Sequence, residues 1–261
     1  MTRLYSKVIL VLIITLLSSP ETVQAQAENV QPDIASSPIS VCFERWRPFS
    51  FVDQDGIAKG EEIDLIKAAA RTLNRTVQFS ELPFKRCVAN VKFGSTDFSL
   101  HVDKTDGLAI FSNTTTFWQL SLAVSAARFQ TLDGFKAIST PRIMLATEYP
   151  YPKAVYRKLE ALDARLVRRS YYEENDEHAK TFFDILTTKR VDAMLVDKQW
   201  AQHMIDKFNL PVNLLAQDFH SEPQYIGYRH SNASLAQQLE AALLALPQNV
   251  RTTIKDRYKY K

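Results

Sequence analysis

The sequence predicts an α/β protein with two lobes, each lobe a mainly parallel sheet flanked by helices. Two observations carry this prediction. Short apolar runs alternate with segments of helical periodicity, a pattern typical of parallel strands joined by crossover helices. The alternation starts twice along the chain, with no Pro/Ser-rich linker between the two series. A chain of 261 residues is long enough for two lobes of roughly 100 to 130 residues each.

The N-terminal segment 1–25 is typical of a secretory signal. Arg3 and Lys7 precede the apolar run 8–17, and small residues follow at possible cleavage points near Ala25 and Ala27. The run is too short to span a bilayer, which requires about 20 apolar residues. We therefore expect residues 1–25 to be a signal peptide removed on export, and the polar, aperiodic residues 26–37 to be a flexible leader.

The first series of elements begins at residue 39. It predicts strands at 39–43, 76–79 and 97–102 and helices at 61–73 and 83–93. In the first helix, Ile63, Leu65, Ile66 and Ala69 are expected to face the core. Pro83 opens the second helix, because the first turn of a helix tolerates a residue without an N–H.

A long apolar segment at 117–124 and a turn at Asp133–Gly134 precede the second series. This series predicts strands at 142–146, 165–167 and 193–196 and helices at 152–161, 177–187 and 198–208. A further strand is expected at 224–228, and helices at 233–246 and 250–258 close the chain.

Composition excludes several classes of function. The six glycines do not form the spacings of phosphate-binding loops, so nucleotide chemistry is not expected. The net charge of +3, with basic and acidic residues interleaved, does not indicate a nucleic-acid binder. Five scattered histidines and two cysteines leave little material for a structural zinc site, and we expect neither a metal nor a cofactor.

The two cysteines are interpreted in the light of the predicted export. An oxidising compartment allows Cys42 and Cys87 to pair, and a bridge closing that loop stabilises a fold by roughly 4 kcal/mol in the chain-entropy model. The alternative is two buried free thiols. We expect the disulfide.

Several motifs together resemble the bacterial family 3 extracellular solute-binding proteins. The segments 46–51 (Trp-Arg-Pro-Phe-Ser-Phe), 55–56 (Asp-Gly) and 60–66 (Gly-Glu-Glu-Ile-Asp-Leu-Ile) resemble the opening of that family. Further similar landmarks follow in the same order: Leu82-Pro83-Phe84, Gly94, Asp97, Phe111-Ser112, 189–193, Asp197 and 225–228. Each is weak alone, but their order covers the chain from about residue 39 to 258.

This resemblance implies a type II periplasmic binding protein, a two-lobed Venus flytrap that closes on a ligand. The first lobe would comprise residues 38–122 plus 228–261 and the second residues 123–227, with hinges near 120–126 and 224–229. The implied protein is a periplasmic monomer that captures a small polar, amino-acid-like solute and presents it to an ABC-type importer or a sensor. It would bind no nucleic acid.

The resemblance also implies ligand contacts in the first lobe. Trp46 stands where the family packs an aromatic ring on the ligand, and its indole offers a flat apolar face and one N–H donor. Glu44 would accept hydrogen bonds from a ligand, or is a solvated surface acid. Phe84 aligns with an apolar contact position, or covers the core.

In the second lobe, Asp197 follows a strand, at the sheet edge where α/β proteins bind ligands. An aspartate at this place in the family binds the ligand ammonium. A helix N-cap is the other role suited to it, and the two are compatible. Thr147, Glu148 and Tyr149 form the corresponding loop after the strand 142–146, although the Pro-Tyr-Pro that follows departs from the glycine-rich family turn.

The sharpest departure from the family is the absence of an arginine in the segment 99–112, where relatives hold the ligand carboxylate with a bidentate fork. Lys104 would supply only a point charge there. His101 and Asp103 form a polar wall of the site rather than a metal pair. A standard α-amino acid is therefore not a secure ligand, and Arg47 or Arg86 are the alternative anion partners.

Two other functions remain open from sequence. One is a periplasmic enzyme on the same fold, similar to a dehydratase, which would need an acid or base such as Glu44, His101 or Asp197. The other is an orphan sensory binding protein without a transporter. We expect a binding protein and not an enzyme, because no nucleophile–base–orienter set is visible.

Overall fold

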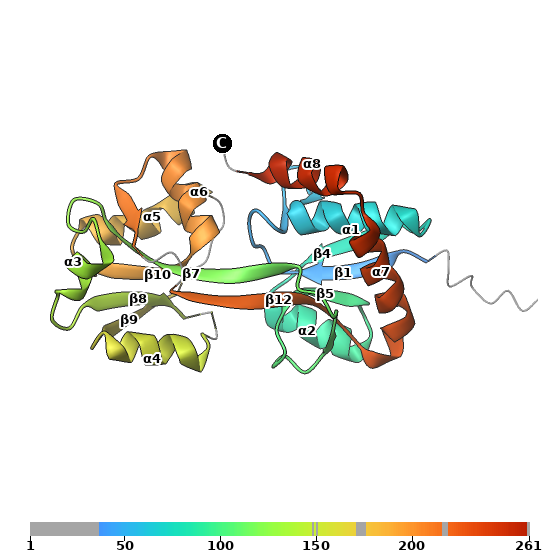
Figure 1. Ribbon diagram of the computed structural model, residues 1–261, viewed down its shortest axis with the longest axis horizontal. Helices are drawn as coiled ribbons and strands as arrows, with labels where there is room; N and C mark the ends of the chain where they lie inside the picture. The colour runs from blue at the N-terminus through green and yellow to red at the C-terminus, as the bar shows by residue number, and fades with distance from the viewer. Residues whose placement is uncertain (1–36, 148, 150, 171–175, 216–218, 260–261) are drawn as a thin grey trace, which may run out of the picture. The chain divides into compact units, whose positions relative to one another are not determined.

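The computed structural model describes residues 37–147, 149, 151–170, 176–215 and 219–259. The predicted signal peptide 1–25 and leader residues 26–36 lie outside the described residues. The described chain is a mixed α/β structure, so the predicted fold class is confirmed (Figure 1).

The elements follow the predicted alternation closely. The strands are β1 (Ile39–Phe43), β2 (Phe51–Val52), β3 (Ala58–Lys59), β4 (Val77–Glu81), β5 (Phe98–Val102), β6 (Ala109–Ile110), β7 (Thr116–Ser125), β8 (Arg142–Ala146), β9 (Arg165–Arg169), β10 (Ala193–Asp197), β11 (Val212–Leu214) and β12 (His220–Tyr228). The helices are α1 (Glu61–Thr72), α2 (Phe84–Phe93), α3 (Leu132–Lys136), α4 (Lys153–Ala161), α5 (Asp176–Thr187), α6 (Lys198–Phe208), α7 (Ala233–Ala245) and α8 (Gln248–Tyr258), with a 3-10 turn η1 (His230–Asn232).

The main sheet has the strand order β4-β1-β5-β12-β7-β10-β8-β9. β1 is parallel to β4 and β5, and β8 is parallel to β9 and β10, as crossover helices require. β7 and β12 lie side by side in the middle of this order and pair antiparallel, with His220 opposite Leu120 and Gln224 opposite Thr116. β12 is longer than the predicted strand 224–228, because polar residues and Pro223 in its first half hide its strand character.

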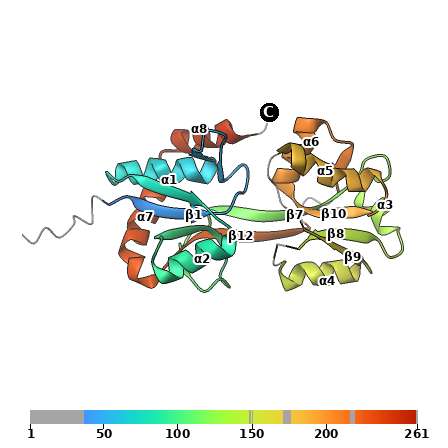
Figure 2. The ribbon, with the colours of Figure 1, turned by 180° about the vertical axis from the view of Figure 1, so that it is seen from behind.

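Helices cover both faces of each parallel part of the sheet (Figures 1 and 2). We call the hydrophobic cluster of β1, β5, α1 and α7 the first core; it includes Ile39, Phe98, Ile63 and Leu239. We call two clusters on the other part of the sheet together the second core: one packs α3 and α4 against β8, and one packs α5 and α6 against β10. Leu120 of β7 is buried in the second core.

One local prediction is wrong. The pair Asp133–Gly134 was expected to form a turn, but both residues lie inside the short helix α3. Thr131 is its N-cap, since its Oγ1 accepts a hydrogen bond from Gly134 N at 3.1 Å. A side-chain cap here offsets the usual preference of Asp-Gly for a turn.

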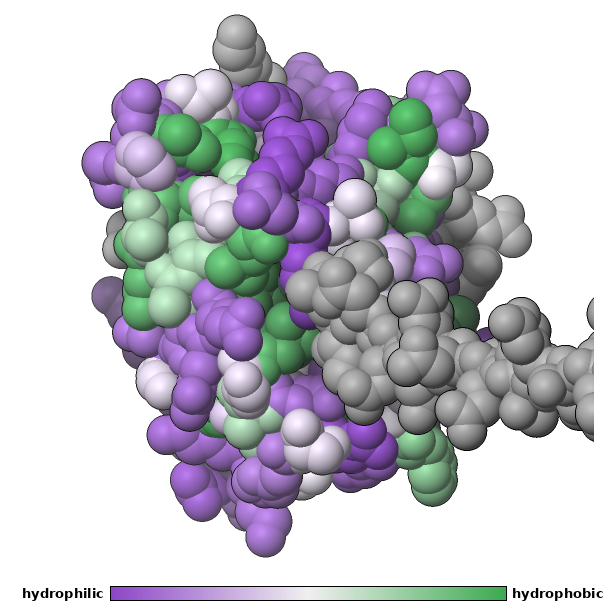
Figure 3. All heavy atoms as spheres, turned by 90° about the vertical axis from the view of Figure 1, so that its right-hand side faces the viewer, coloured by the Kyte–Doolittle hydropathy of each residue, from purple (hydrophilic) through white to green (hydrophobic). Residues whose placement is uncertain are grey.

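The surface mixes hydrophilic and apolar side chains. Figure 3 shows this for the end of the molecule on the right of Figure 1, where apolar patches lie between polar ones. The most exposed large apolar residues, Phe93, Leu244 and Ile57, are scattered on different elements, which is ordinary for a protein surface. In the part of the chain that the structure describes, no helix combines the length and apolar character needed to cross a membrane.

Candidate functional site

His101, on β5, forms a buried pair with Glu62 of α1. His101 Nε2 and Glu62 Oε2 lie 2.6 Å apart, and the two residues are 8% and 4% exposed. The backbone of His101 has a φ of 60°, in the left-handed region that a residue with a Cβ adopts at a cost. Such backbone strain persists where the surroundings hold a side chain in place, which is common at functional sites.

The position of Glu62 follows from the way α1 begins. Gly60 precedes the helix with a φ of 131°, and a Cβ there would lie 2.2 Å from the Phe49 carbonyl oxygen. This close approach lets Glu62 N donate a hydrogen bond to Phe49 O at 3.1 Å. The positive end of the helix stabilises a negative charge in this first turn. The second oxygen of Glu62, Oε1, is buried and has no hydrogen-bond partner among the described residues.

Trp46 follows β1, and its indole packs against His101. The two ring centroids are 4.7 Å apart and the ring planes are at 84°. A tight turn holds the tryptophan, since Trp46 N donates to Ser50 O at 2.7 Å and Ser50 N donates to Trp46 O at 2.9 Å. The Phe49 ring packs on the indole with a centroid distance of 4.8 Å. The half-buried indole is therefore fixed beside the imidazole.

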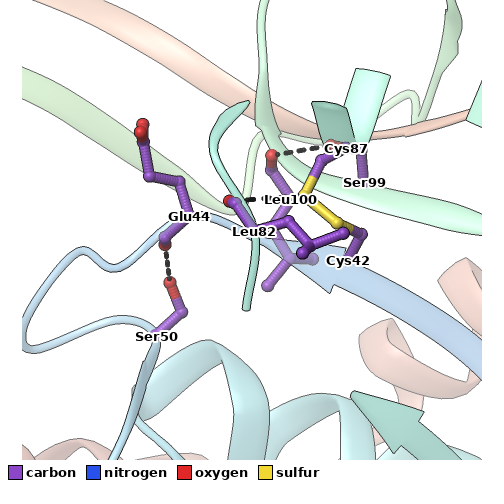
Figure 4. Close-up of a disulfide and its surroundings, with 7 residues drawn as sticks. All are labelled: Cys42, Glu44, Ser50, Leu82, Cys87, Ser99 and Leu100. Atoms are coloured by element: carbon purple, nitrogen blue, oxygen red, sulfur yellow. Dashed lines mark hydrogen bonds between the residues drawn. A yellow bond between two sulfur atoms is a disulfide. The ribbon is translucent and has the colours of Figure 1, made fainter. Parts of the chain in front are cut away.

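Glu44 comes directly after β1, where its side chain extends away from the Ser50 hydroxyl that binds its carbonyl (Figure 4). Burial raises the pKa of Glu44, while the backbone N–H of Phe84 and the charge of His101 oppose the shift. Phe84 begins α2 and is half-buried. The predicted contact residues Glu44 and Phe84 thus meet each other, beside His101.

A disulfide between Cys42 and Cys87 fastens this corner of the site, and its prediction is confirmed (Figure 4). The Cα atoms are 5.3 Å apart, and both residues are fully buried. Cys42 lies two residues before Glu44 and Cys87 three residues after Phe84. The bridge therefore joins the end of β1 to the first turn of α2, and keeps Glu44 and Phe84 close to each other.

Asp197 ends β10, which belongs to the second core. Its Oδ1 accepts a hydrogen bond from Trp200 N at 2.8 Å, so it is the N-cap of α6. Its Oδ2 is enclosed and finds no partner in the described chain. Burial raises the pKa of Asp197 to about 7, against the N–H groups of Trp200 and Gln199, the Trp46 side chain and the charge of His101. The residue as a whole is only half-buried, and it is the carboxylate itself that is shielded from water.

We call Glu44, Glu62, His101 and Asp197 the acidic cluster. Glu44 directly follows β1, and the other members lie on α1, β5 and β10. His101 Nε2 is 2.6 Å from Glu62 Oε2, and the charge of His101 lowers the pKa of both Glu44 and Asp197. Across the described residues, no group of three or more His, Cys, Asp or Glu side chains is arranged to hold a metal ion. Buried acids with oxygens that lack a donor are suited to hydrogen-bond donors from outside the protein, and most strongly to charged ones.

The remaining predicted contact residues are Thr147, Glu148, Tyr149 and Lys104, and their contact with a ligand stays a prediction. Thr147 and Tyr149 follow β8 and are exposed; Thr147 N donates to Arg169 O at 3.0 Å. Tyr149 joins an aromatic group, with its ring centroid 6.1 Å from that of Trp118. Glu148 lies outside the described residues. Lys104 is exposed, and its ammonium lies 6.0 Å from the ring centroid of Tyr225 on β12.

The segment that lacks the family arginine forms a compact turn. Asp103 N donates to Asp106 Oδ2 at 2.8 Å, and Thr105 Oγ1 donates to Asp103 Oδ1 at 2.6 Å. The acidic side chains of this turn are therefore used to bind its own backbone and hydroxyl.

Sequence reasoning missed Glu62. It lies on the same helical face as Ile66, Ala69 and Ala70, which are buried. An acid on an apolar stripe was the available signal, because a carboxylate is almost never fully buried unless it is paired.

The fold is that of the type II periplasmic binding proteins. The chain belongs to the bacterial extracellular solute-binding proteins, family 3, whose family model matches residues 39–260. A search of curated proteins found no match.

Solved structures of this fold are similar along most of the chain. An ancestral arginine-binding protein bound to arginine has a TM-score of 0.66 at 20% identity, covering 86% of this chain and 99% of that one. A substrate binding protein of an ABC uptake transporter from Streptococcus pneumoniae, with bound histidine, has a TM-score of 0.64 at 17% identity, covering 86% and 93%. The ancestral amino acid-binding protein AncCDT-1, a precursor of cyclohexadienyl dehydratase, has a TM-score of 0.62 at 18% identity, covering 86% and 96%. At these identities the likeness shows the fold.

Proposed function

We propose that the protein is a periplasmic solute-binding protein that captures a small polar solute at the acidic cluster. One observation carries the proposal. The enclosed, unpartnered carboxylate oxygen of Asp197 comes from the second core, yet the groups that act on this carboxylate include Trp46 and His101 from the other part of the sheet. A polar ligand that donates to this oxygen would contact both parts of the molecule and so favour a closed arrangement.

The proposal includes the lobes and the partners. The lobes are residues 38–122 plus 228–261 and residues 123–227, with β7 and β12 as the hinge strands. The long antiparallel pairing of these two strands supports this division, because it links the two parallel parts of the sheet. The loaded monomer would deliver its solute to an ABC-type importer, and an orphan sensory role is the alternative partner.

A thermal-shift screen of amino acids, amines, organic acids and sugars tests the function. We expect at least one compound to raise the melting temperature, since a ligand that binds only the folded state stabilises it by mass action. Small-angle scattering should then show a decrease in the radius of gyration. If no compound in the four classes gives either response, the binding function is wrong.

The buried Glu62–His101 pair is the observation that favours an enzyme as second candidate, because such a pair can exchange a proton with a substrate. The test is turnover of a prephenate-like substrate, with His101→Ala as the control variant. We expect no turnover, because a substrate with two carboxylates would face the acids of the cluster.

A further inference from the structure

We propose that the ligand is a small organic cation, an amine without a carboxylate group, and not a zwitterionic amino acid. This inference rests on the proposed binding function and names the ligand class of the same site.

The first support is the buried oxygen of Glu62. The side chain is 4% exposed, and Oε1 has no hydrogen-bond partner in the described part of the chain, while Oε2 is bound to His101. A buried carboxylate oxygen without a donor costs free energy comparable to a lost charged hydrogen bond. Such an atom persists where a bound ligand supplies the missing donor, and an ammonium group has up to three N–H donors to offer.

The second support comes from Asp197, on a different element. Its second oxygen, Oδ2, is enclosed as well and makes no hydrogen bond of ordinary geometry within the described chain, although the Trp46 side chain acts on this carboxyl as a hydrogen-bond donor and lowers its pKa. Two such oxygens served by separate strands and helices suit a cation with several N–H donors. The neighbouring indole adds an aromatic face that attracts cations.

The third support is the charge balance. A ligand carboxylate placed in the cluster would face the acids Glu44, Glu62 and Asp197. The basic group that acts on Glu44 and Asp197 is His101, which already binds Glu62 at 2.6 Å. Like charges at close range in a shielded site repel strongly.

Two basic side chains near the cluster in sequence, Lys104 and Arg47, are candidate partners for a ligand carboxylate. Lys104 is exposed, with its ammonium over the Tyr225 ring. Arg47 stacks its guanidinium over Phe51, with 3.8 Å from Cζ to the ring centroid. Arg47 Nε is buried without an acceptor among the described residues, so this arginine is a rival site for a ligand carboxylate.

Matched pairs of compounds test the proposal on the full exported chain. Each pair is an amino acid and the amine that its decarboxylation gives: arginine and agmatine, lysine and cadaverine, histidine and histamine. Calorimetric titration at pH 7.5 should show that at least one amine binds 10-fold or more tightly than its parent amino acid. If each amino acid that binds does so as tightly as its amine or more tightly, the proposal is overturned and the solute-binding function remains intact. If none of the six compounds binds but an organic acid or a sugar does, the cation proposal is also wrong. Failure of every compound class overturns both.

Four variants locate the effect. Asp197→Asn keeps an N-cap side chain and Glu62→Gln keeps the side-chain size; each should weaken binding of the best amine by about 10- to 100-fold. The matched controls are Asp206→Asn on the same helix α6 and Glu61→Gln on the same helix α1, which remove the same charge outside the cluster and should change affinity less than 3-fold. If the controls weaken binding as much as the cluster variants, the cluster does not hold the cation.

Arg47→Gln examines the rival. If an amino acid binds the unmodified protein at least as tightly as its amine, and Arg47→Gln abolishes this binding, Arg47 is the carboxylate partner and the proposal is overturned. Retention of the preference for the amine supports it. Circular dichroism of every variant confirms that the fold is retained.

Discussion

Glu62 and Asp197 are two acids in a similar state that are held in different ways. Each has one carboxylate oxygen bound and one enclosed without a partner in the described chain. Glu62 is bound by His101, 39 positions away in sequence, whereas Asp197 is bound by the backbone of its own helix. The Glu62 carboxylate is therefore positioned by tertiary packing, whereas the Asp197 carboxylate is positioned by the first turn of α6. We call the part of the site formed by Glu44, Glu62 and His101 the platform.

The platform is reinforced next to Glu44 by the Cys42–Cys87 disulfide, and the Asp197 side has no comparable cross-link, since these are the molecule's two cysteines. If the comparison is correct, damage to the platform should lower both stability and affinity. Changes at Asp197 should alter affinity and pH dependence while leaving the fold stable or improving it.

The largest effect is expected from the disulfide. The double variant Cys42→Ala and Cys87→Ala removes a cross-link with a sequence separation of 45 residues, and the free energy of unfolding should fall by about 4 kcal/mol. Urea denaturation measures this change, and reduction of the unmodified protein should reproduce it. A fall below about 1 kcal/mol would show that packing alone holds β1 to α2.

Next in size is the Glu62–His101 pair. Glu62→Ala leaves His101 buried without its partner and should cost about 3 kcal/mol of stability. A double-mutant cycle with His101→Gln should give a coupling free energy of about 1.5 to 3 kcal/mol. A coupling near zero would mean that Glu62 is not fixed by the histidine, and the contrast with Asp197 would be lost.

Removal of the Asp197 charge should raise the free energy of unfolding, whereas the two preceding changes lower it. The folded-state pKa of about 7 lies above the unfolded value of 3.8, so the folded state binds the proton more tightly. The stabilising effect of this proton is complete below about pH 4 and is lost as pH rises through 7. The groups facing the carboxylate are the N–H groups of Trp200 and Gln199 on α6, Trp46, and His101 on β5.

We therefore expect Asp197→Asn to stabilise the ligand-free protein at pH 8. The whole shift corresponds to about 4 kcal/mol at 1.36 kcal/mol per pKa unit; the side chain is only half-buried, so water screens part of it and we expect about 2 kcal/mol. Thermal unfolding between pH 4 and 8 measures the difference, with Asp206→Asn as the control. A variant less stable than the unmodified protein at pH 8 would contradict this.

The same comparison explains what could be predicted from sequence. Apolar periodicity placed β1, α1, β5, β10 and α6 correctly, because these elements are specified by residues close together in the chain. The resemblance to the family pointed to Glu44, Trp46, Phe84 and Asp197, and His101 was expected as a polar wall of the site. The fold brings interacting pairs of these residues together, while their contact with a ligand stays a prediction. Glu62 could not be predicted in the same way, since its burial depends on a histidine from a distant strand.

One further difference has the same origin. The helix α3 was missed because the side chain of Thr131 caps its first turn, which offsets the local preference of Asp-Gly for a turn. The ammonium of Lys104 lies over the Tyr225 ring, and its role as a ligand contact stays a prediction.

The smallest effect tests whether the platform also responds to charge. Burial raises the pKa of Glu44, so Glu44→Gln should stabilise the protein slightly above the raised pKa, by less than about 1 kcal/mol, because the Phe84 N–H and His101 oppose the shift. Urea denaturation at pH 5 and pH 8 measures the change, and the effect at pH 8 should be smaller than that of Asp197→Asn. An effect equal to or larger than that of Asp197→Asn would mean that stability depends more on the charge of Glu44 than on that of Asp197, and would contradict the contrast between the two parts of the site.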